Sequence, residues 1–200
     1  MDLRSLLAHP RFYSCFASAV GGGARAQYAR QYLRARPGER ILDMGCGTAD
    51  ILDYLPAGVD YTGFDLSADY IAAARSRYGE RGQFRNEPVD VALAGRLGSF
   101  DLAMANGVLH HLDDAGAHSL FELAKRVLAP GGRLVTLDGC FVPGQSRIAR
   151  FLLSRDRGRF VRNEDEYLRL AHASFGRVAH DVRHDLLRIP YTLIIMECRL

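Results

Sequence analysis

The sequence predicts an α/β fold, a doubly wound and mostly parallel seven-stranded sheet with helices on both faces and an antiparallel C-terminal strand. Short strands of the buried type alternate with helical patterns between residues 39 and 137. Glycine-rich or proline-rich breaks, such as 45–47 and 130–132, separate many of them. Strands separated by helices favour a parallel sheet, and right-handed crossovers bring every carboxyl end to one edge. Ligands of open sheets bind at that edge.

The first 36 residues are predicted to be helical. Apolar residues recur at spacings of three and four from residue 3 onward, and Pro10 marks a break. Gly21–Gly23 then form a joint before a second helical segment, which Pro37 ends.

The central elements follow in a regular order. Strands are predicted at 39–44, 60–65, 83–89, 100–105 and 133–137, and helices at 51–55, 67–79 and 114–128. Ser67 is the expected N-cap of the second of these helices.

The pattern changes after Asp138. Residues 139–145 are expected to form a loop, and the helices 146–156 and 164–175 to follow it, the second capped by Asn163. The last residues are predicted to form two strands joined around Ile189 and Pro190.

These elements predict one domain with four parts. We expect a helical lid at 1–36, a cofactor-binding core at 37–138, a helical cap insertion at 139–170, and strands at 171–200 that complete the sheet.

The composition is that of an ordinary globular protein. The chain has 200 residues, 48% of them hydrophobic and 24% charged, which suits a single domain with a full core. No apolar run is long enough to cross a bilayer and no secretory signal is evident, so a cytoplasmic location is expected. The net charge is +3, and Lys125 is the only lysine among 26 basic residues.

The cysteines predict neither a disulfide framework nor a metal site. Cys15, Cys46, Cys140 and Cys198 are far apart and show no paired spacing. We expect reduced thiols, and no metal.

The segment ILDMGCGTAD, residues 41–50, carries the most chemical information. Gly45 and Gly47 allow a tight turn and close approach of a ligand to the backbone. A dinucleotide fingerprint would need a small residue where Asp50 stands, beside a pyrophosphate. Asp43, just before the glycines, instead suits a ligand with an ammonium group, such as S-adenosylmethionine. A purely structural turn remains the alternative.

An acid at the end of the second strand supports a nucleoside ligand. Asp65 closes the segment YTGFD, 18 residues after Gly47. A carboxylate there is placed to accept both hydroxyls of a ribose. The alternative is a carboxylate at a helix start, because Ser67 is near.

Residues 41–138 resemble the class I S-adenosylmethionine-dependent methyltransferase family, whose fold is Rossmann-like. ILDMGCGTAD resembles the first motif of that family and GFDLS the second. FDLAMANGVLHHLDD resembles the fourth strand with its loop, and LAPGGRLVTLD the fifth-strand signature. The resemblance implies methyl transfer from S-adenosylmethionine, with S-adenosylhomocysteine as product.

The resemblance also implies a set of cofactor-binding residues. These are Asp43, Gly45, Cys46 and Gly47 for the methionine portion, Asp65 for the ribose, Leu66 for the adenine, and Asn106, Gly107 and Val108 facing the sulfonium. The family often ends its third strand with an acid and a small residue, but Pro88 and Val89 stand there in this chain. Either Asp90 substitutes after a local shift, or the backbone N–H of Val89 alone reads the adenine ring.

The motifs identify the cofactor better than the catalytic group. A general base is needed only if the acceptor holds a proton at working pH. His110, after the fourth strand, is the candidate catalytic residue, with Asp138 as a second candidate and His111 beside it. Local capping or packing is the alternative for the histidine pair, and His172, His180 and His184 are expected at the surface or in strands.

The acceptor is expected to contact the parts outside the core. Phe12, Tyr13 and Phe16 are candidates for an aromatic lid, with packing on the sheet as the alternative. The segment 147–162 holds six arginines and one acid, which suggests an anionic or hydrophobic acceptor, or peripheral membrane contact; a solvated surface is the alternative.

We therefore predict a methyltransferase for a small molecule. A non-catalytic S-adenosylmethionine-binding scaffold is the alternative. A nucleic-acid methyltransferase is disfavoured, because Asn106–Leu109 lacks the proline and aromatic residues expected there. A dehydrogenase is disfavoured by Asp50. The sequence does not predict an oligomeric state.

Overall fold

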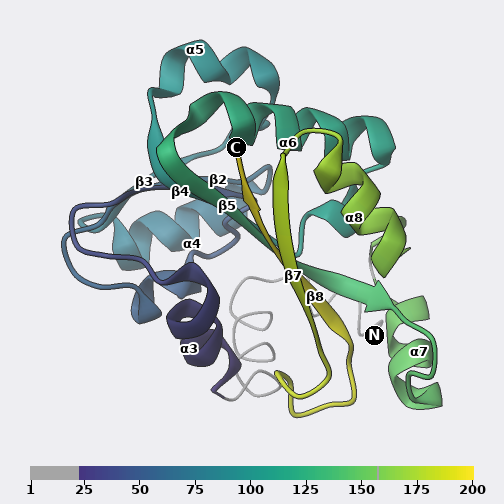
Figure 1. Ribbon diagram of the computed structural model, residues 1–200. Helices are drawn as coiled ribbons and strands as arrows, with labels where there is room; N and C mark the ends of the chain where they lie inside the picture. The colour runs from purple at the N-terminus through teal and green to yellow at the C-terminus, as the bar shows by residue number, and fades with distance from the viewer. Residues whose placement is uncertain (1–22, 157) are drawn as a thin grey trace.

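A computed structural model describes residues 23–156 and 158–200. The predicted lid residues Phe12, Tyr13 and Phe16, together with Cys15, lie outside the described residues. At the centre is a mixed sheet whose strand order is β3-β2-β1-β4-β5-β8-β7 (Figure 1).

The strands confirm the predicted fold class. Their bounds are β1 Arg40–Met44, β2 Asp60–Phe64, β3 Gly82–Arg85, β4 Phe100–Asn106, β5 Leu128–Phe141, β7 Arg177–Arg183 and β8 Leu193–Arg199. Strands β1 to β5 pair in parallel, and β8 runs antiparallel to both β5 and β7. A two-residue strand, β6 Arg162–Asn163, adds to the predicted seven by pairing with the end of β5.

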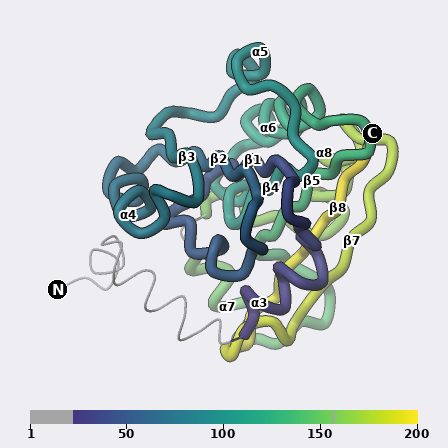
Figure 2. Tube along the Cα trace, turned by 90° about the vertical axis from the view of Figure 1, so that its left-hand side faces the viewer, coloured from purple at the N-terminus to yellow at the C-terminus, as the bar shows by residue number. Residues whose placement is uncertain are grey.

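Helical elements cover both faces of the sheet. They are α3 Ala24–Tyr28, the π-helix η1 Ala29–Leu33, the 3-10 helices η2 Asp50–Tyr54, η3 Val91–Leu93 and η4 Leu109–His111, and the α-helices α4 Ala68–Tyr78, α5 Ala94–Leu97, α6 Asp114–Val127, α7 Arg147–Ser154 and α8 Glu164–His172. Figures 1 and 2 both show α5 and α6 on one side of the sheet and α3 on the other.

The alternation of side chains along each strand builds two core layers. On β1, Leu42 and Met44 pack in one cluster with Phe121 of α6, whereas Ile41 packs in the other with Ile71 of α4. Successive strand residues therefore bind the sheet to helices on opposite faces.

The predicted helix caps are confirmed. The Ser67 hydroxyl accepts a hydrogen bond from the backbone N–H of Tyr70 at the start of α4. Asn163 and Glu166 form a complete capping box at the start of α8.

Several predicted boundaries were wrong. The helix before Pro37 ends at Leu33, because Arg34 adopts a left-handed conformation with φ 46°. The segment after the glycine turn is a short 3-10 helix, interrupted by Pro56. The third strand ends at Arg85 rather than at residue 89.

The largest difference lies after Asp138. The segment 139–145 was predicted as a loop, but β5 continues to Phe141. Two partners support this extension, since Gly139 pairs with Leu193 of β8 and Cys140 pairs with Arg162 of β6. The proposed division between core and cap at residue 138 stays a prediction, and β5 crosses it.

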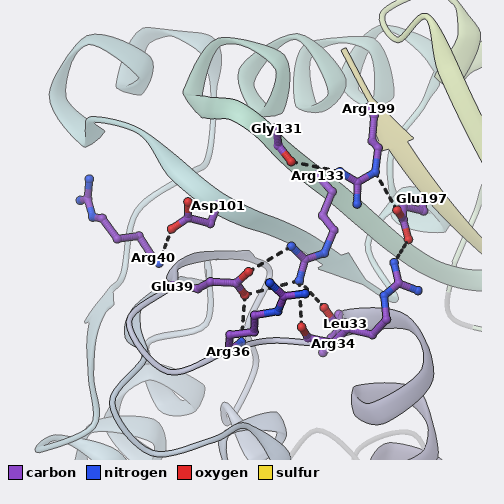
Figure 3. Close-up of polar contacts among 10 residues, drawn as sticks. All are labelled: Leu33, Arg34, Arg36, Glu39, Arg40, Asp101, Gly131, Arg133, Glu197 and Arg199. Carbon is purple, nitrogen blue, oxygen red and sulfur yellow. Dashed lines mark hydrogen bonds and ion pairs between the residues drawn. The ribbon is translucent and has the colours of Figure 1, made fainter.

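At the amino edge of the sheet, the buried Arg133 is paired with a carboxylate, although its Nε has no partner among the described residues (Figure 3). The Arg133 guanidinium donates to the carbonyl of Leu33 at 2.5 Å and lies 3.3 Å from a carboxylate oxygen of Glu39. Arg34 and Arg199 both bind Glu197 on β8. This network joins the end of η1 to β5 and β8.

Candidate active site

A cavity of about 440 Å³ opens at the carboxyl edge of β1 and β4. Its lining includes polar side chains from four parts of the chain: Tyr28 of α3, Asp43 of β1, Asn106 of β4, and Asp156 after α7. The apolar lining comes largely from the hairpin between β7 and β8. Figures 1 and 2 both show the closed end of that hairpin near α3.

The glycine-rich turn forms one wall, and its conformation requires glycine. Gly45 and Gly47 have φ values of 84° and 55°. The N–H groups of Gly45 and Cys46 both donate to the carbonyl of Phe64 at 2.8 Å, which fixes the turn against β2. A Cβ at Gly45 would lie 2.5 Å from Cγ2 of Val108, so the turn and the loop after β4 fit closely together.

Asp43 has an unusual environment for a carboxylate. It is 2% exposed, and one oxygen accepts a hydrogen bond of 2.5 Å from the Tyr61 hydroxyl. The other oxygen, Oδ1, has no protein partner. Burial raises the pKa of Asp43 to about 7, although the hydrogen bond from Tyr61 opposes this rise. A cationic ligand group would stabilise the ionised form.

Asp65 holds the backbone around the same turn. Its two carboxylate oxygens accept hydrogen bonds from the N–H groups of Ser67 at 2.8 Å and Gly47 at 2.9 Å. A carboxylate offers about four acceptor positions, so two remain for ribose hydroxyls. The helix-start role and the predicted ligand role of Asp65 are therefore compatible.

The predicted adenine contacts lie outside the cavity. Leu66 is 74% exposed, and Val89 packs partly buried against the core. The Asp90 carboxylate accepts a hydrogen bond from the N–H of Ala92 at 2.8 Å, which caps η3. Asp90 is thus engaged with its own backbone, and the adenine contacts stay a prediction.

The structure adds two side chains that no motif marked. The hydroxyl of Tyr28, a buried residue of α3, donates to Asn106 Oδ1 at 2.5 Å and thereby orients the amide at the end of β4. Arg25 lines the cavity and lies 3.6 Å from the carboxylate of Asp50, which also pairs with Arg77 at 3.0 Å. Helical periodicity places Tyr28 and Arg25 on a helix but does not identify what they face.

The two candidate bases, His110 and Asp138, form one pair. The His110 ring contacts Asp138 through Nδ1 at 2.8 Å, and its Nε2 lies 3.4 Å from Oδ1 of Asp156. Burial disfavours the charged imidazole, but the hydrogen bond to Asp138 and the charges of Asp138 and Asp156 outweigh it and raise the pKa of His110. Asp138 itself is 1% exposed, and its Oδ2 has no partner.

Asp156 is the member of this chain of charges that lines the cavity. Its carboxylate accepts hydrogen bonds from the Tyr191 hydroxyl and from the N–H of Gly158, the latter at 2.9 Å. Burial raises the pKa of Asp156, but these hydrogen bonds and the charges of the nearby histidines lower it overall. Sequence reasoning missed Asp156, because it stood as the single acid in an arginine-rich segment.

The other histidines lie elsewhere in the fold. His180 of β7 contacts Glu164, and His184 contacts Thr192. His172 closes α8 and is exposed.

The described arginines of residues 147–162 do not line the cavity. Arg162 is buried and binds the carbonyls of Leu109 and Leu112 and the carboxylate of Asp114. Arg150 lies over the ring of Phe141. Arg25 is the only arginine among the described side chains that line the cavity.

The cavity fits a ligand with an ammonium group. Asp43, Gly45 and Gly47 line the cavity, and Oδ1 of Asp43 is buried with no partner among the described residues. Among residues 23–156 and 158–200, no three histidine, cysteine or acidic side chains are grouped to hold a metal.

Within the described part of the chain, every helix is too short or too polar to span a bilayer.

Comparisons with known proteins point to one family. A family model described as a methyltransferase domain matches residues 42–134. The O-methyltransferase resE of Aspergillus sclerotiorum is 34% identical over 128 residues, which cover 60% of this chain and 48% of that protein. The EEF1A lysine methyltransferase 4 of Bos taurus is 34% identical over 118 residues, which cover 51% and 46%. The chain thus spans about half the length of these relatives.

Solved structures share the fold. The pyocyanin biosynthetic protein PhzM aligns with a TM-score of 0.74 and 16% identity, covering 100% of this chain and 62% of that one. A TehB-like SAM-dependent methyltransferase from Corynebacterium glutamicum aligns with a TM-score of 0.66 and 20% identity, covering 96% and 99%. The motifs, the strand order and the family match agree that residues 42–134 form a methyltransferase domain of the class I S-adenosylmethionine-dependent type.

Proposed function

We propose that this protein transfers the methyl group of S-adenosylmethionine to a small, largely apolar acceptor. The observation that carries the proposal is the carboxylate of Asp43, which lines the cavity beside the glycine turn and whose Oδ1 has no partner among the described residues. The family match indicates S-adenosylmethionine as the cofactor, and the carboxylate of Asp43 would attract its ammonium group. S-adenosylmethionine would contribute an electrophilic methyl group on a sulfonium that leaves as the thioether of S-adenosylhomocysteine.

The residues at the carboxyl edge have distinct proposed roles. Asp43 would pair with the ammonium, the turn at Gly45–Gly47 would admit the methionine portion, and Asp65 would accept the ribose hydroxyls. Asn106, fixed by Tyr28, and the adjoining Gly107 would face the reacting centre. Because such a displacement needs alignment and exclusion of water, rigid side chains of this kind are the main protein contribution.

The acceptor end is proposed to lie under the β7–β8 hairpin. Leu186, Leu187 and Ile189 bring apolar surface to the cavity opposite the glycine turn. The names of relatives support a small acceptor, since resE is an O-methyltransferase and other relatives are ubiquinone biosynthesis O-methyltransferases. The sheltered apolar lining favours a small molecule over a nucleic acid.

The predicted role of His110 as a general base stays a prediction. Its two ring nitrogens face Asp138 and Asp156, so the imidazole would act on an acceptor by way of Asp156 unless the ring turns.

A transfer assay tests the proposal. The purified protein is incubated with S-adenosylmethionine labelled in its methyl group and a panel of apolar phenols, hydroxyquinones and amines. We expect label in an organic product and an equal amount of S-adenosylhomocysteine. Tight cofactor binding without transfer to any panel member would favour the non-catalytic scaffold instead.

A further inference from the structure

We infer that Asp156 is the acceptor-recognition residue of this site, and that it selects an uncharged acceptor with a hydroxyl or amino hydrogen-bond donor over an anionic acceptor. The inference rests on the proposed function and names the acceptor class that the same site would take. It replaces the anionic acceptor that the arginine-rich segment suggested.

The charged side chains of the cavity lining indicate which group an acceptor would contact. Within residues 23–156 and 158–200, the charged residues that line the cavity are Arg25, Asp43, Asp50 and Asp156. Arg25 and Asp50 pair with each other, which leaves the two other acids facing the cavity. Asp43 is beside the glycine turn, where the ammonium would bind. Asp156 is therefore the charge that an acceptor would meet.

The position of Asp156 is fixed by its neighbours. The Tyr191 hydroxyl and the Gly158 N–H hold its two oxygens, and His110 lies behind one of them. His110 is in turn held by Asp138, whose second oxygen is buried and unpaired. Two hydrogen bonds and the ionic contact with His110 leave at least one acceptor position of the Asp156 carboxylate for a ligand.

The charge of Asp156 and of its neighbours disfavours an anionic acceptor. The hydrogen bonds from Tyr191 and Gly158 and the nearby histidines lower the pKa of Asp156, so its carboxylate is ionised at neutral pH. The buried arginine nearest in sequence, Arg162, is engaged with Asp114 and backbone carbonyls. Among the described residues that line the cavity, the cation Arg25 is paired with Asp50, so an anionic acceptor group would meet the Asp156 carboxylate, which is unfavourable at short range.

The remaining lining defines the frame of the acceptor. Leu186, Leu187 and Ile189 line the cavity on the same hairpin that supplies Tyr191. An apolar body would lie against these side chains while its hydroxyl or amino group donates to Asp156.

A matched set of ligands tests this inference without knowledge of the natural acceptor. Calorimetry first measures S-adenosylhomocysteine, and para-propylphenol, para-propylbenzoate and para-propylanisole are then titrated into the complex at pH 7. The phenol is neutral and donates, the benzoate is anionic, and the anisole is neutral without a donor. We expect the phenol to bind at least about tenfold more tightly than either of the others.

Variants then separate recognition from general effects. Asp156→Asn keeps the shape but removes the charge, and we expect the preference for phenol over benzoate to fall below about threefold, with unchanged binding of S-adenosylhomocysteine. Asp185→Asn changes an exposed carboxylate on the same hairpin, outside the cavity lining, and should leave the preference intact. NMR titration of the His110 imidazole supplies a readout independent of ligands, and Asp156→Asn should lower its pKa.

The outcomes distinguish the two proposals. Failure of S-adenosylhomocysteine to bind would overturn the proposed function, and the acceptor inference with it. If S-adenosylhomocysteine binds but the phenol does not bind at millimolar concentration, the acceptor inference is wrong while the cofactor assignment stands. Equal or tighter binding of the benzoate, or a preference that survives Asp156→Asn, has the same meaning.

Discussion

The two edges of the sheet differ in the partners of their buried charged side chains. At the amino edge, Arg133 is 7% exposed and has partners for both terminal nitrogens, in Glu39 and the carbonyl of Leu33. At the carboxyl edge, Asp43 and Asp138 are 2% and 1% exposed, and each leaves one oxygen without a partner. The Arg133 charge is balanced by the carboxylate of Glu39, although its Nε has no partner among the described residues. Asp43, in contrast, forms no ion pair with any described residue.

The difference distinguishes a charged side chain that stabilises the fold, such as Arg133, from one that would pair with a ligand, such as Asp43. Burying an ion without partners costs free energy, so a matched network stabilises the fold and an unmatched carboxylate lowers its stability. An unmatched group is kept where its partner arrives with a ligand. Substitutions at the two edges should therefore affect different quantities.

The largest expected effect is on stability, at the amino edge. Arg133→Met leaves Glu39 and the carbonyl of Leu33 without their donor, and we expect the free energy of unfolding to fall by about 3 kcal/mol. Urea unfolding measures this loss. Arg199→Met, a change in an exposed member of the same network, should cost under about 1 kcal/mol. The affinity of folded Arg133→Met for S-adenosylhomocysteine should change less than about twofold. A loss of binding in this variant would contradict the assignment of the amino edge to stability alone.

The reverse pattern is expected for Asp43→Asn at the carboxyl edge. Asparagine can still accept the hydrogen bond from Tyr61, but it gives no charge to the ammonium. Affinity for S-adenosylhomocysteine should fall about 100-fold, the loss of one buried charged contact. Stability at pH 8 should rise or stay constant, because the raised pKa of Asp43 means that its ionisation is unfavourable in the fold. Unfolding and calorimetry on the same preparation check both signs.

The ribose assignment predicts a similar but smaller loss. Asp65→Ala removes the proposed acceptor of the ribose hydroxyls, and affinity should weaken by about one to two orders of magnitude. Asp113→Ala, which removes the cap of α6, is the matched control and should bind as the wild type does. Unchanged affinity in Asp65→Ala would mean that its carboxylate only ties Ser67 and Gly47.

Cofactor binding should depend on pH through Asp43. Its pKa of about 7 in the ligand-free protein must fall when an ammonium binds, so binding releases a proton below pH 7. Affinity should fall by about tenfold for each pH unit below about pH 6.5, and the binding enthalpy should vary with the ionisation enthalpy of the buffer. Asp43→Asn should remove this dependence; its persistence would point to another group.

The smallest effect is expected far from the cavity. Asn163→Ala removes the capping box of α8 and should lower the free energy of unfolding by about 1 kcal/mol. Cofactor affinity should not change. A change in affinity would show that the cap region is coupled to the site more strongly than its contacts indicate.

The parts of the fold set by local patterns could be predicted from sequence. Buried strands, the glycine turn and the caps Ser67 and Asn163 follow from residues near one another in the chain. The extension of β5 could not be predicted, because it depends on pairing with β6 and β8 rather than on its own residues. The early end of the third strand also has no local signal other than Pro88.

The candidate site divides along the same line. Asp43, the glycines, Asn106 and Gly107 were predicted from motifs and line one cavity. Tyr28, Asp156 and Tyr191 were not predicted, because they lie outside the motif segments. Only the tertiary fold shows that they line the cavity. His110 and Asp138 were named separately, and the fold makes them one pair.

Calorimetric titration of S-adenosylmethionine and S-adenosylhomocysteine into the purified protein, with NAD as control, tests the central claim most directly. The account predicts micromolar binding of both sulfur compounds, no binding of NAD, and proton release below pH 7 that Asp43→Asn abolishes. Absence of binding by either sulfur compound, or preferential binding of NAD, would contradict the claim that the unpaired carboxylate at the carboxyl edge is prepared for this cofactor.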